Sequence, residues 1–141
     1  MTKLLINIDV DDLARAVDFY TRAFELTVGR RFGDGGVELL GGTSPIYLLL
    51  KPAGTAPSAA AGSVARARDY GRHWTPVHLD VAVDDLEAAV KRAEAAGATL
   101  EQPIVASGWG RMALLADPFG HGFCVLQFEG EGYDAIATGR G

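Results

Sequence analysis

The sequence has one cysteine, no long apolar run and no excess of positive charge, and each absence excludes a class of protein. Because Cys124 is the only cysteine, an intrachain disulfide and a multi-cysteine metal site are both excluded. No apolar run approaches the ~20 residues that a membrane helix needs, and the N-terminus lacks the pattern of a signal peptide. The formal net charge of −5 disfavours nonspecific binding to nucleic acid and mildly favours cationic partners. We therefore expect a cytoplasmic protein with no nucleic-acid or membrane partner.

The chain length limits the number of domains. At 141 residues it can form one domain or two half-size units that share a core. Hydrophobic residues make up 48% of it, which suits a soluble globular protein. A half-size unit buries too little surface to be stable alone. We therefore expect two units to pack together, or each to pack on a partner chain.

An internal repeat organises the sequence. Residues 10–13, Val-Asp-Asp-Leu, recur as residues 83–86, and each copy is followed at the same spacing by Ala-Val. Each copy follows a stretch of alternating apolar residues, typical of a strand, and precedes a helical pattern. One aspartate of each pair is expected to cap its helix, with Asp84 and Glu87 spaced as a capping box.

Strand patterns follow both helices. They cover Thr27–Phe32, Val37–Leu40 and Ile46–Lys51 in the first copy, and Thr99–Val105, Arg111–Ala116 and Phe123–Phe128 in the second. The expected core stripes of the two helices are Leu13, Val17, Tyr20 and Phe24, then Leu86, Val90 and Ala93. We therefore predict an α+β fold of two tandem βαβββ modules, at residues 1–51 and 74–128. The aperiodic connection at 52–73 is expected to be mobile or to form a lid, and the tail at 129–141 to be loosely docked.

The last turn, Asp117-Pro118-Phe119-Gly120-His121, and the sequence Asp18-Phe19-Tyr20 complete a recognisable pattern. Together with the repeat they resemble the vicinal oxygen chelate superfamily, which comprises glyoxalases, bleomycin-resistance proteins and dioxygenases. The resemblance covers about residues 3–128. It implies a curved mixed sheet around a cavity, and commonly a homodimer in which modules pair across subunits. The family commonly has Gly where this chain has Glu25, so Glu25 is expected at positive φ.

The metal-dependent members of the superfamily place one ligand, normally His, Glu or Gln, on the first and last strand of each module. The matching positions are Leu5, His78, Cys124 and either Tyr47 or Leu49. Only His78 is a ligand-type residue there, with Cys124 a chemically possible second, whereas a catalytic zinc or iron site usually needs about three protein ligands. We therefore expect no cofactor. Asp9 and Asp80 share the cavity-facing side of their strands. A register shift would bring them to the ligand positions, so a zinc, nickel or iron site stays an alternative.

The candidate catalytic residues are His78 and His121. His78 is interpreted as a hydrogen-bonding or acid–base group, or else as a former ligand position satisfied by Asp80. His121 follows a tight turn, where a turn-stabilising or exposed role is the simpler alternative. The candidate ligand-binding residues offer aromatic area or polar atoms, and they are Tyr47, Trp74, Asp80, Trp109, Arg111 and Cys124. The alternatives are packing at a sheet edge for the tryptophans, solvated surface for Arg111 and an inert buried thiol for Cys124.

Three functions are compatible with this pattern. The first is a metal-independent protein that binds a small organic molecule in the cavity of the paired modules. The second is a metal-dependent lyase or dioxygenase of glyoxalase type. The third is a metal-free isomerase or hydrolase that uses a histidine base. The loss of ligand-type residues at the family's metal positions favours the first.

Overall fold

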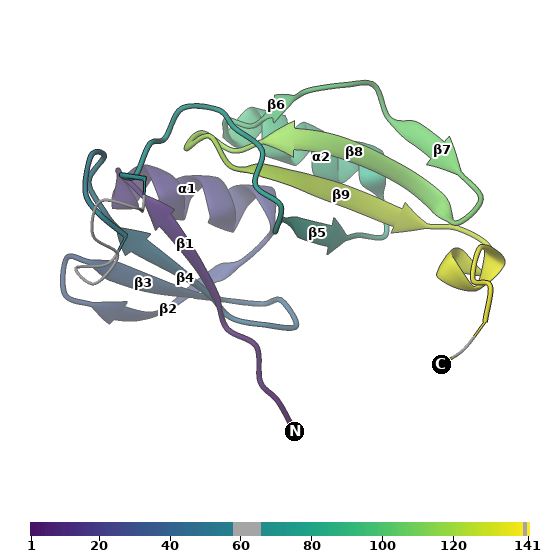
Figure 1. The fold of residues 1–141 in the computed structure, drawn as a ribbon, viewed down its shortest axis with the longest axis horizontal. Coiled ribbons are helices and arrows are strands. Elements are labelled where there is room, and N and C mark those ends of the chain that lie inside the picture. The colour runs from purple at the N-terminus through teal and green to yellow at the C-terminus, as the bar shows by residue number, and fades with distance from the viewer. Residues whose placement is uncertain (58–65, 140) are drawn as a thin grey trace. The chain divides into compact units, whose positions relative to one another are not determined.

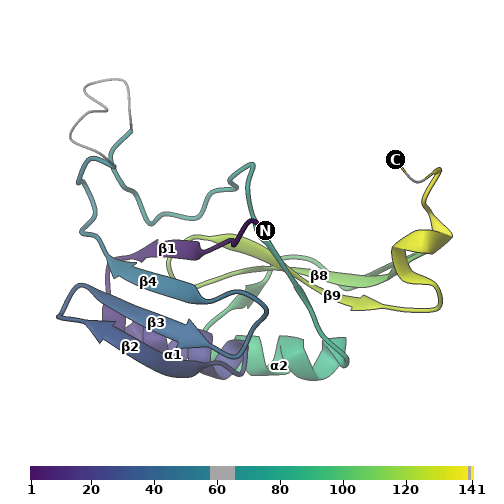
Figure 2. The same cartoon turned by 90° about the horizontal axis from the view of Figure 1, so that it is seen from below.

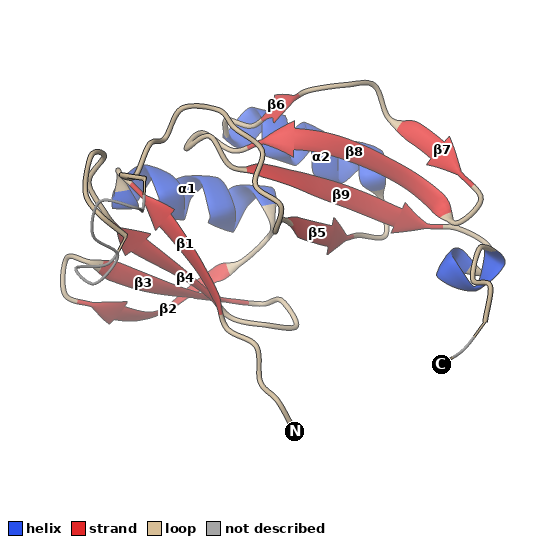
Figure 3. Ribbon diagram, in the orientation of Figure 1, coloured by secondary structure: helices blue, strands red, loops and turns tan. Residues whose placement is uncertain are grey.

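In the computed structural model of the protein, residues 1–57, 66–139 and 141 are described. The chain forms two compact units, Met1–Gly71 and Arg72–Gly141. Each unit contains a sheet with parallel and antiparallel pairings, and one α-helix packs on each sheet (Figures 1 and 3). The predicted α+β class of two modules, each ordered strand, helix, then further strands, is confirmed. No helix among the described residues has the length and apolar character to cross a membrane.

The first unit has a four-stranded sheet in the order β1-β4-β3-β2. Its elements are β1 (Ile6–Val10), α1 (Leu13–Ala23), β2 (Thr27–Phe32), β3 (Gly36–Leu40) and β4 (Ile46–Leu50). The β1 strand pairs with β4 in parallel, and the other pairings are antiparallel. Figure 2 shows α1 along one face of this sheet. Val37, Leu39 and Leu48 are buried at 0–1% exposure, whereas residues that alternate with them point to the opposite face.

The second unit repeats this arrangement. Its elements are β5 (Leu79–Ala82), α2 (Leu86–Ala96), β6 (Thr99–Leu100), β7 (Val105–Ser107), β8 (Gly110–Ala116) and β9 (Gly122–Phe128). The strand order is β5-β9-β8-β6, with β7 also paired to β8. As in the first unit, the strand before the helix pairs in parallel with the last strand. The predicted continuous strand Thr99–Val105 is wrong: it is split into β6 and β7 around Pro103, which has no N–H for a ladder hydrogen bond.

The second aspartate of each repeat caps its helix. Asp12 accepts a hydrogen bond from the backbone N of Arg15, and Asp85 from that of Ala88, each at 3.0 Å. The expected Asp84–Glu87 capping box is therefore wrong. Because Asp85 is the cap, the Glu87 side chain is free to extend outward, where it accepts hydrogen bonds from Arg111.

One helix buries its whole predicted stripe, and the other buries only part of it. Helix α2 buries Leu86, Ala89, Val90 and Ala93, which includes the whole predicted stripe. Helix α1 buries Ala16, Phe19, Tyr20 and Ala23, while the predicted Leu13, Val17 and Phe24 are only half-buried. Alanine lets a helix approach a sheet closely, so the α1 face with Ala16 and Ala23 is the one that packs inward. Glu25, after α1, has φ 54°, as predicted from the resemblance.

The described residues of the tail and of the connection make specific contacts. Tail residues Gly132–Ala135 form a short 3₁₀ helix, and the Tyr133 ring packs on Phe128 at a centroid distance of 4.7 Å. In the connection, Arg68 donates hydrogen bonds to the backbone O and to the Oγ1 of Thr55, and Arg68 Nε lies 2.8 Å from the Asp9 carboxylate. The prediction of a mobile connection or lid falls partly on residues 58–65, which lie outside the described residues.

Candidate functional site

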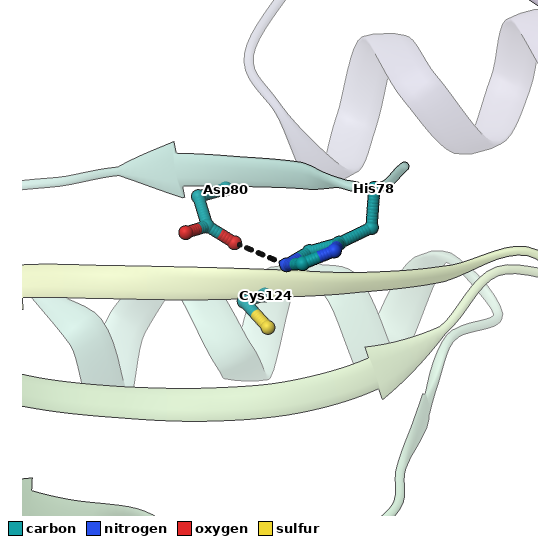
Figure 4. A group of neighbouring side chains, drawn as sticks. All are labelled: His78, Asp80 and Cys124. Carbon is teal, nitrogen blue, oxygen red and sulfur yellow. Dashed lines mark ion pairs between the residues drawn. The ribbon is translucent and has the colours of Figure 1, made fainter. Parts of the chain in front are cut away.

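The second unit brings three of the predicted site residues together. His78 immediately precedes β5, Asp80 lies on β5, and Cys124 lies opposite Asp80 on β9. His78 Nε2 is 3.2 Å from Asp80 Oδ1, and one ligand-type atom from each side chain lies within 4.8 Å of the others (Figure 4). Among residues 1–57, 66–139 and 141, this is the one group of three or more His, Cys, Asp or Glu side chains so placed.

The thiol in this group is held in its protonated form. Cys124 is buried, and burial together with the neighbouring Asp80 carboxylate raises its pKa to about 11. The thiol acts as a hydrogen-bond partner of Asp80 and is therefore poorly suited to act as a nucleophile at neutral pH. This agrees with the interpretation of Cys124 as an inert buried thiol.

An exposed tryptophan lies beside the histidine. The Trp74 ring lies 4.6 Å from the His78 ring, centroid to centroid, and the Trp74 residue is 46% exposed. Gly122 leaves room for this ring, because a Cβ there would lie 2.5 Å from Trp74 Cε3. Arg72 lies over the ring at 5.8 Å, and its guanidinium is fixed by Glu101 at 2.7 and 2.5 Å. The result is an aromatic surface beside hydrogen-bonding groups.

His121 has a different environment. It forms an isolated bridge with His73, and its backbone N donates to the buried Asp117 carboxylate at 2.8 Å. The same carboxylate accepts from the backbone N of Phe119, as expected for an aspartate that stabilises a tight turn. His121 is not among the three grouped side chains, and its catalytic role stays a prediction.

Arg111 and Trp109 are not brought to the group. Arg111 pairs across β8–β9 with Gln127, three residues from Cys124, so these side chains point to opposite faces of the sheet. Its guanidinium forms ion pairs with the carboxylates of Glu87 and Glu129. The Trp109 ring packs against Phe128 at 5.9 Å and Tyr133 at 5.4 Å. The alternative of packing at the sheet edge therefore describes Trp109 well.

The matching positions of the first unit carry no comparable group. Leu5 is apolar and exposed, and Leu49 is apolar on β4. The Tyr47 hydroxyl donates to Glu38 Oε2 at 3.0 Å, and Asp9 is paired with Arg68. The residues present therefore do not supply the four-ligand metal set of the superfamily, although His78, Asp80 and Cys124 offer nitrogen, oxygen and sulfur donors of the kinds that zinc accepts.

Sequence reasoning missed a second polar group, in the first unit. Glu38 on β3 is buried and accepts hydrogen bonds from Arg30 and Tyr47. The signal for it was a lone glutamate within the apolar segment Val37–Leu40, facing two arginines across a hairpin. The ladder between Val28 and Arg31 is irregular, and this shift decides that Arg30 is the partner. Such a shift cannot be read from strand alternation.

Comparisons with known proteins agree with this architecture. An uncharacterized protein of Mycobacterium tuberculosis is 33% identical over 120 residues, 84% of this chain and 69% of the relative. The anthracycline biosynthesis protein DnrV of Streptomyces peucetius is 31% identical over 95% of this chain, which spans only 44% of DnrV. The solved structure of TnmS3, an antibiotic binding protein from Streptomyces sp. CB03234, superposes with a TM-score of 0.62 at 20% identity, covering 92% of this chain and 97% of TnmS3. The model of the glyoxalase-like domain matches residues 5–126, and the chain therefore belongs to the glyoxalase-like family.

Proposed function

We propose that the protein binds a small organic molecule without a resident metal, using the face of the second unit that carries His78 and Asp80. The observation that carries this proposal is the exposed Trp74 ring, which lies 4.6 Å from the His78 ring at a tilt of 44°, beside the Asp80 carboxylate. An indole face offers a large apolar contact area at small entropic cost, and nearby polar atoms orient a ligand. The absence of a His, Glu or Gln at Leu5 and at either Tyr47 or Leu49 favours a binding protein over a metal enzyme.

The names of two similar proteins support an organic ligand. TnmS3 is described as an antibiotic binding protein, and DnrV as an anthracycline biosynthesis protein. For this chain we infer only the class, a planar or partly planar organic molecule. We also propose, from the family resemblance, that the protein acts as a cytoplasmic homodimer. A monomeric mass at micromolar concentration would contradict the dimer.

Binding is tested by titrating the ¹⁵N-labelled full chain with 2-naphthamide, a neutral planar probe, and following the indole N–H resonances by NMR. We expect the Trp74 resonance to move, and Trp74→Ala to weaken binding by about tenfold, equivalent to ~1.4 kcal/mol. Trp109→Ala is the matched control, because that ring packs on Phe128 and Tyr133. An equal loss in both variants would contradict the assignment of binding to Trp74.

The alternative is a metal-dependent lyase or dioxygenase of glyoxalase type, and the grouping of His78, Asp80 and Cys124 is the observation in its favour. Metal analysis of protein purified without chelator separates the two functions, followed by activity assays with added nickel, zinc and ferrous iron. Near-stoichiometric metal that is lost in His78→Ala would overturn the proposed metal-independent function.

A further inference from the structure

The polar group of the first unit is built around a buried carboxylate. The Glu38 side chain is 7% exposed. Its Oε1 accepts from the backbone N and Nε of Arg30 at 3.1 and 3.0 Å, and its Oε2 accepts from Arg30 Nη2 at 2.5 Å and from the Tyr47 hydroxyl at 3.0 Å. Gly29 permits this approach, since a Cβ there would lie 2.7 Å from Oε1. Glu38 therefore fixes one edge of the Arg30 guanidinium.

The remainder of the Arg30 side chain faces outward. The Arg30 side chain as a whole is 68% exposed, and none of the described residues accepts a hydrogen bond from its Nη1. Its guanidinium carbon lies 5.6 Å from the centre of the Phe32 ring, within the range of a cation–π contact. Phe32 is itself 48% exposed, and its ring lies 6.1 Å from that of Tyr47. These side chains form an aromatic surface bordered by a fixed cation.

All of these groups lie on the face of the sheet opposite α1. Glu38 pairs with Tyr47 across β3–β4 and alternates with the buried Val37 and Leu39, which face the helix. The face is therefore not covered by the helix of its own unit.

The charges of Arg30 and Glu38 favour a ligand that forms directional hydrogen bonds over one that is attracted by net charge alone. Hydrogen bonding to Arg30 lowers the pKa of Glu38 to about 2, and Glu38 raises the pKa of Arg30. Both groups are charged at neutral pH, so the pair has almost no net charge. A ligand is then selected by the outward N–H groups of Arg30, whose strongest acceptors are carboxylate-type oxygens, and by stacking on a ring.

We infer that Arg30, Phe32 and Tyr47 form a recognition site for a planar aromatic molecule that bears a carboxylate or similar oxyanion. The ring stacks on Phe32 and Tyr47, and the oxyanion accepts hydrogen bonds from the outer edge of Arg30. Glu38 is a positioning residue that holds the guanidinium in place. This site lies in the first unit and does not depend on binding at Trp74.

The test compares two probes of the same shape, 2-naphthoate and the neutral 2-naphthamide, titrated into the ¹⁵N-labelled full chain. Backbone resonances of residues 27–50 report this site, and the Trp74 indole reports the site in the second unit. We expect the wild-type chain to bind naphthoate about tenfold more tightly than naphthamide at residues 27–50. Arg30→Gln should abolish that preference.

Arg31→Gln is the matched control, because Arg31 is the neighbouring exposed arginine and its loss changes the net charge equally. It should keep the preference for naphthoate. Since Arg30→Gln leaves Glu38 without its charged partner, Arg30→Gln/Glu38→Gln provides a neutral version of the pair. Phe32→Leu leaves the pair intact and should weaken naphthoate binding severalfold.

Three results would overturn the inference. They are equal affinity of the wild-type chain for both probes, an equal loss of preference in Arg30→Gln and Arg31→Gln, and the absence of shifts at residues 27–50 at millimolar naphthoate. The proposed function fails separately, when the Trp74 indole resonance is unmoved by naphthamide. The two failures are read from different resonances.

Discussion

Cys124 lies directly opposite Asp80 across the parallel β5–β9 ladder, and its thiol is a hydrogen-bond partner of the Asp80 carboxylate. Burial and the Asp80 charge raise the thiol pKa from 9.0 to about 11. Because only the thiolate reacts, we expect iodoacetamide at pH 8 to modify native Cys124 about 100-fold more slowly than the urea-unfolded chain. Mass spectrometry of time points measures both rates.

Asp80→Asn should accelerate the reaction of native Cys124 with iodoacetamide, but by clearly less than about 100-fold, since burial is the larger cause of the raised thiol pKa. Asp84→Asn, an exposed aspartate of the same unit, is the control and should leave the rate unchanged. Equal modification rates in the native and the unfolded chain would contradict the description of Cys124 as a buried, protonated thiol. Because the folded state disfavours the thiolate, the free energy of unfolding should fall as the pH rises from 9.0 toward 11.

Glu38 should make the stability of the protein dependent on acid pH. Its folded-state pKa of about 2 lies below the ordinary value of 4.5. A carboxyl with a lowered pKa contributes stability above its unfolded pKa, and this contribution is lost as the pH falls from 4.5 toward 2. We therefore expect the urea midpoint of the wild-type chain to exceed that of Glu38→Gln at pH 7, and the difference to shrink at pH 3. Glu94→Gln, at an exposed glutamate on α2, should show no such convergence. Parallel pH profiles for wild type and Glu38→Gln would refute the prediction.

The repeat carries most of what the sequence could predict. Strand alternation and the duplicated Val-Asp-Asp-Leu placed both helices and most strands, because these features depend on local periodicity. They also placed Asp80 of β5 and the preceding His78 on the same side of the chain. The pairing of Asp80 with Cys124 requires the register between β5 and β9, which local periodicity does not contain.

Contacts between distant side chains were not predictable for the same reason. Arg111 was interpreted as a ligand-binding group, yet its partners Glu87 and Glu129 come from α2 and from the segment after β9. The tail was expected to be loosely docked because its sequence has no apolar pattern. In the structure its Tyr133 ring contacts Trp109 and Phe128. Apart from Phe128, these partners are remote in sequence.

Glu25 is a position where backbone strain can be relieved. It is the non-glycine residue with positive φ among the described residues, at 54°. A side chain disfavours this region, whereas glycine does not, and part of the gain is offset by the greater freedom of glycine in the unfolded chain. We expect Glu25→Gly to raise the free energy of unfolding by about 0.5–1 kcal/mol, measured by urea denaturation. Glu25→Ala keeps the Cβ and should give no gain; equal gains in both variants would show that the backbone is not the cause.

Gly122 should determine the position of Trp74. A Cβ at residue 122 would lie 2.5 and 2.6 Å from two atoms of the Trp74 ring and 2.8 Å from Arg72 Nη2. Because Trp74 is partly exposed, its ring can move away at little cost to the fold, so Gly122→Ala should remain folded. We expect the Trp74 indole resonance to shift while that of Trp109 stays in place, and 2-naphthamide to bind more weakly.

The matched control is Gly35→Ala, because an added Cβ there meets no atom within 4 Å. Both variants exchange glycine for alanine, so a general effect of that exchange would appear in both. If Gly122→Ala leaves the Trp74 resonance and probe binding unchanged, the ring is not held against β9 as described. If the resonance shifts but binding is unaffected, the indole is not part of the proposed binding surface, and the function proposed for the second unit would have to be assigned to other residues.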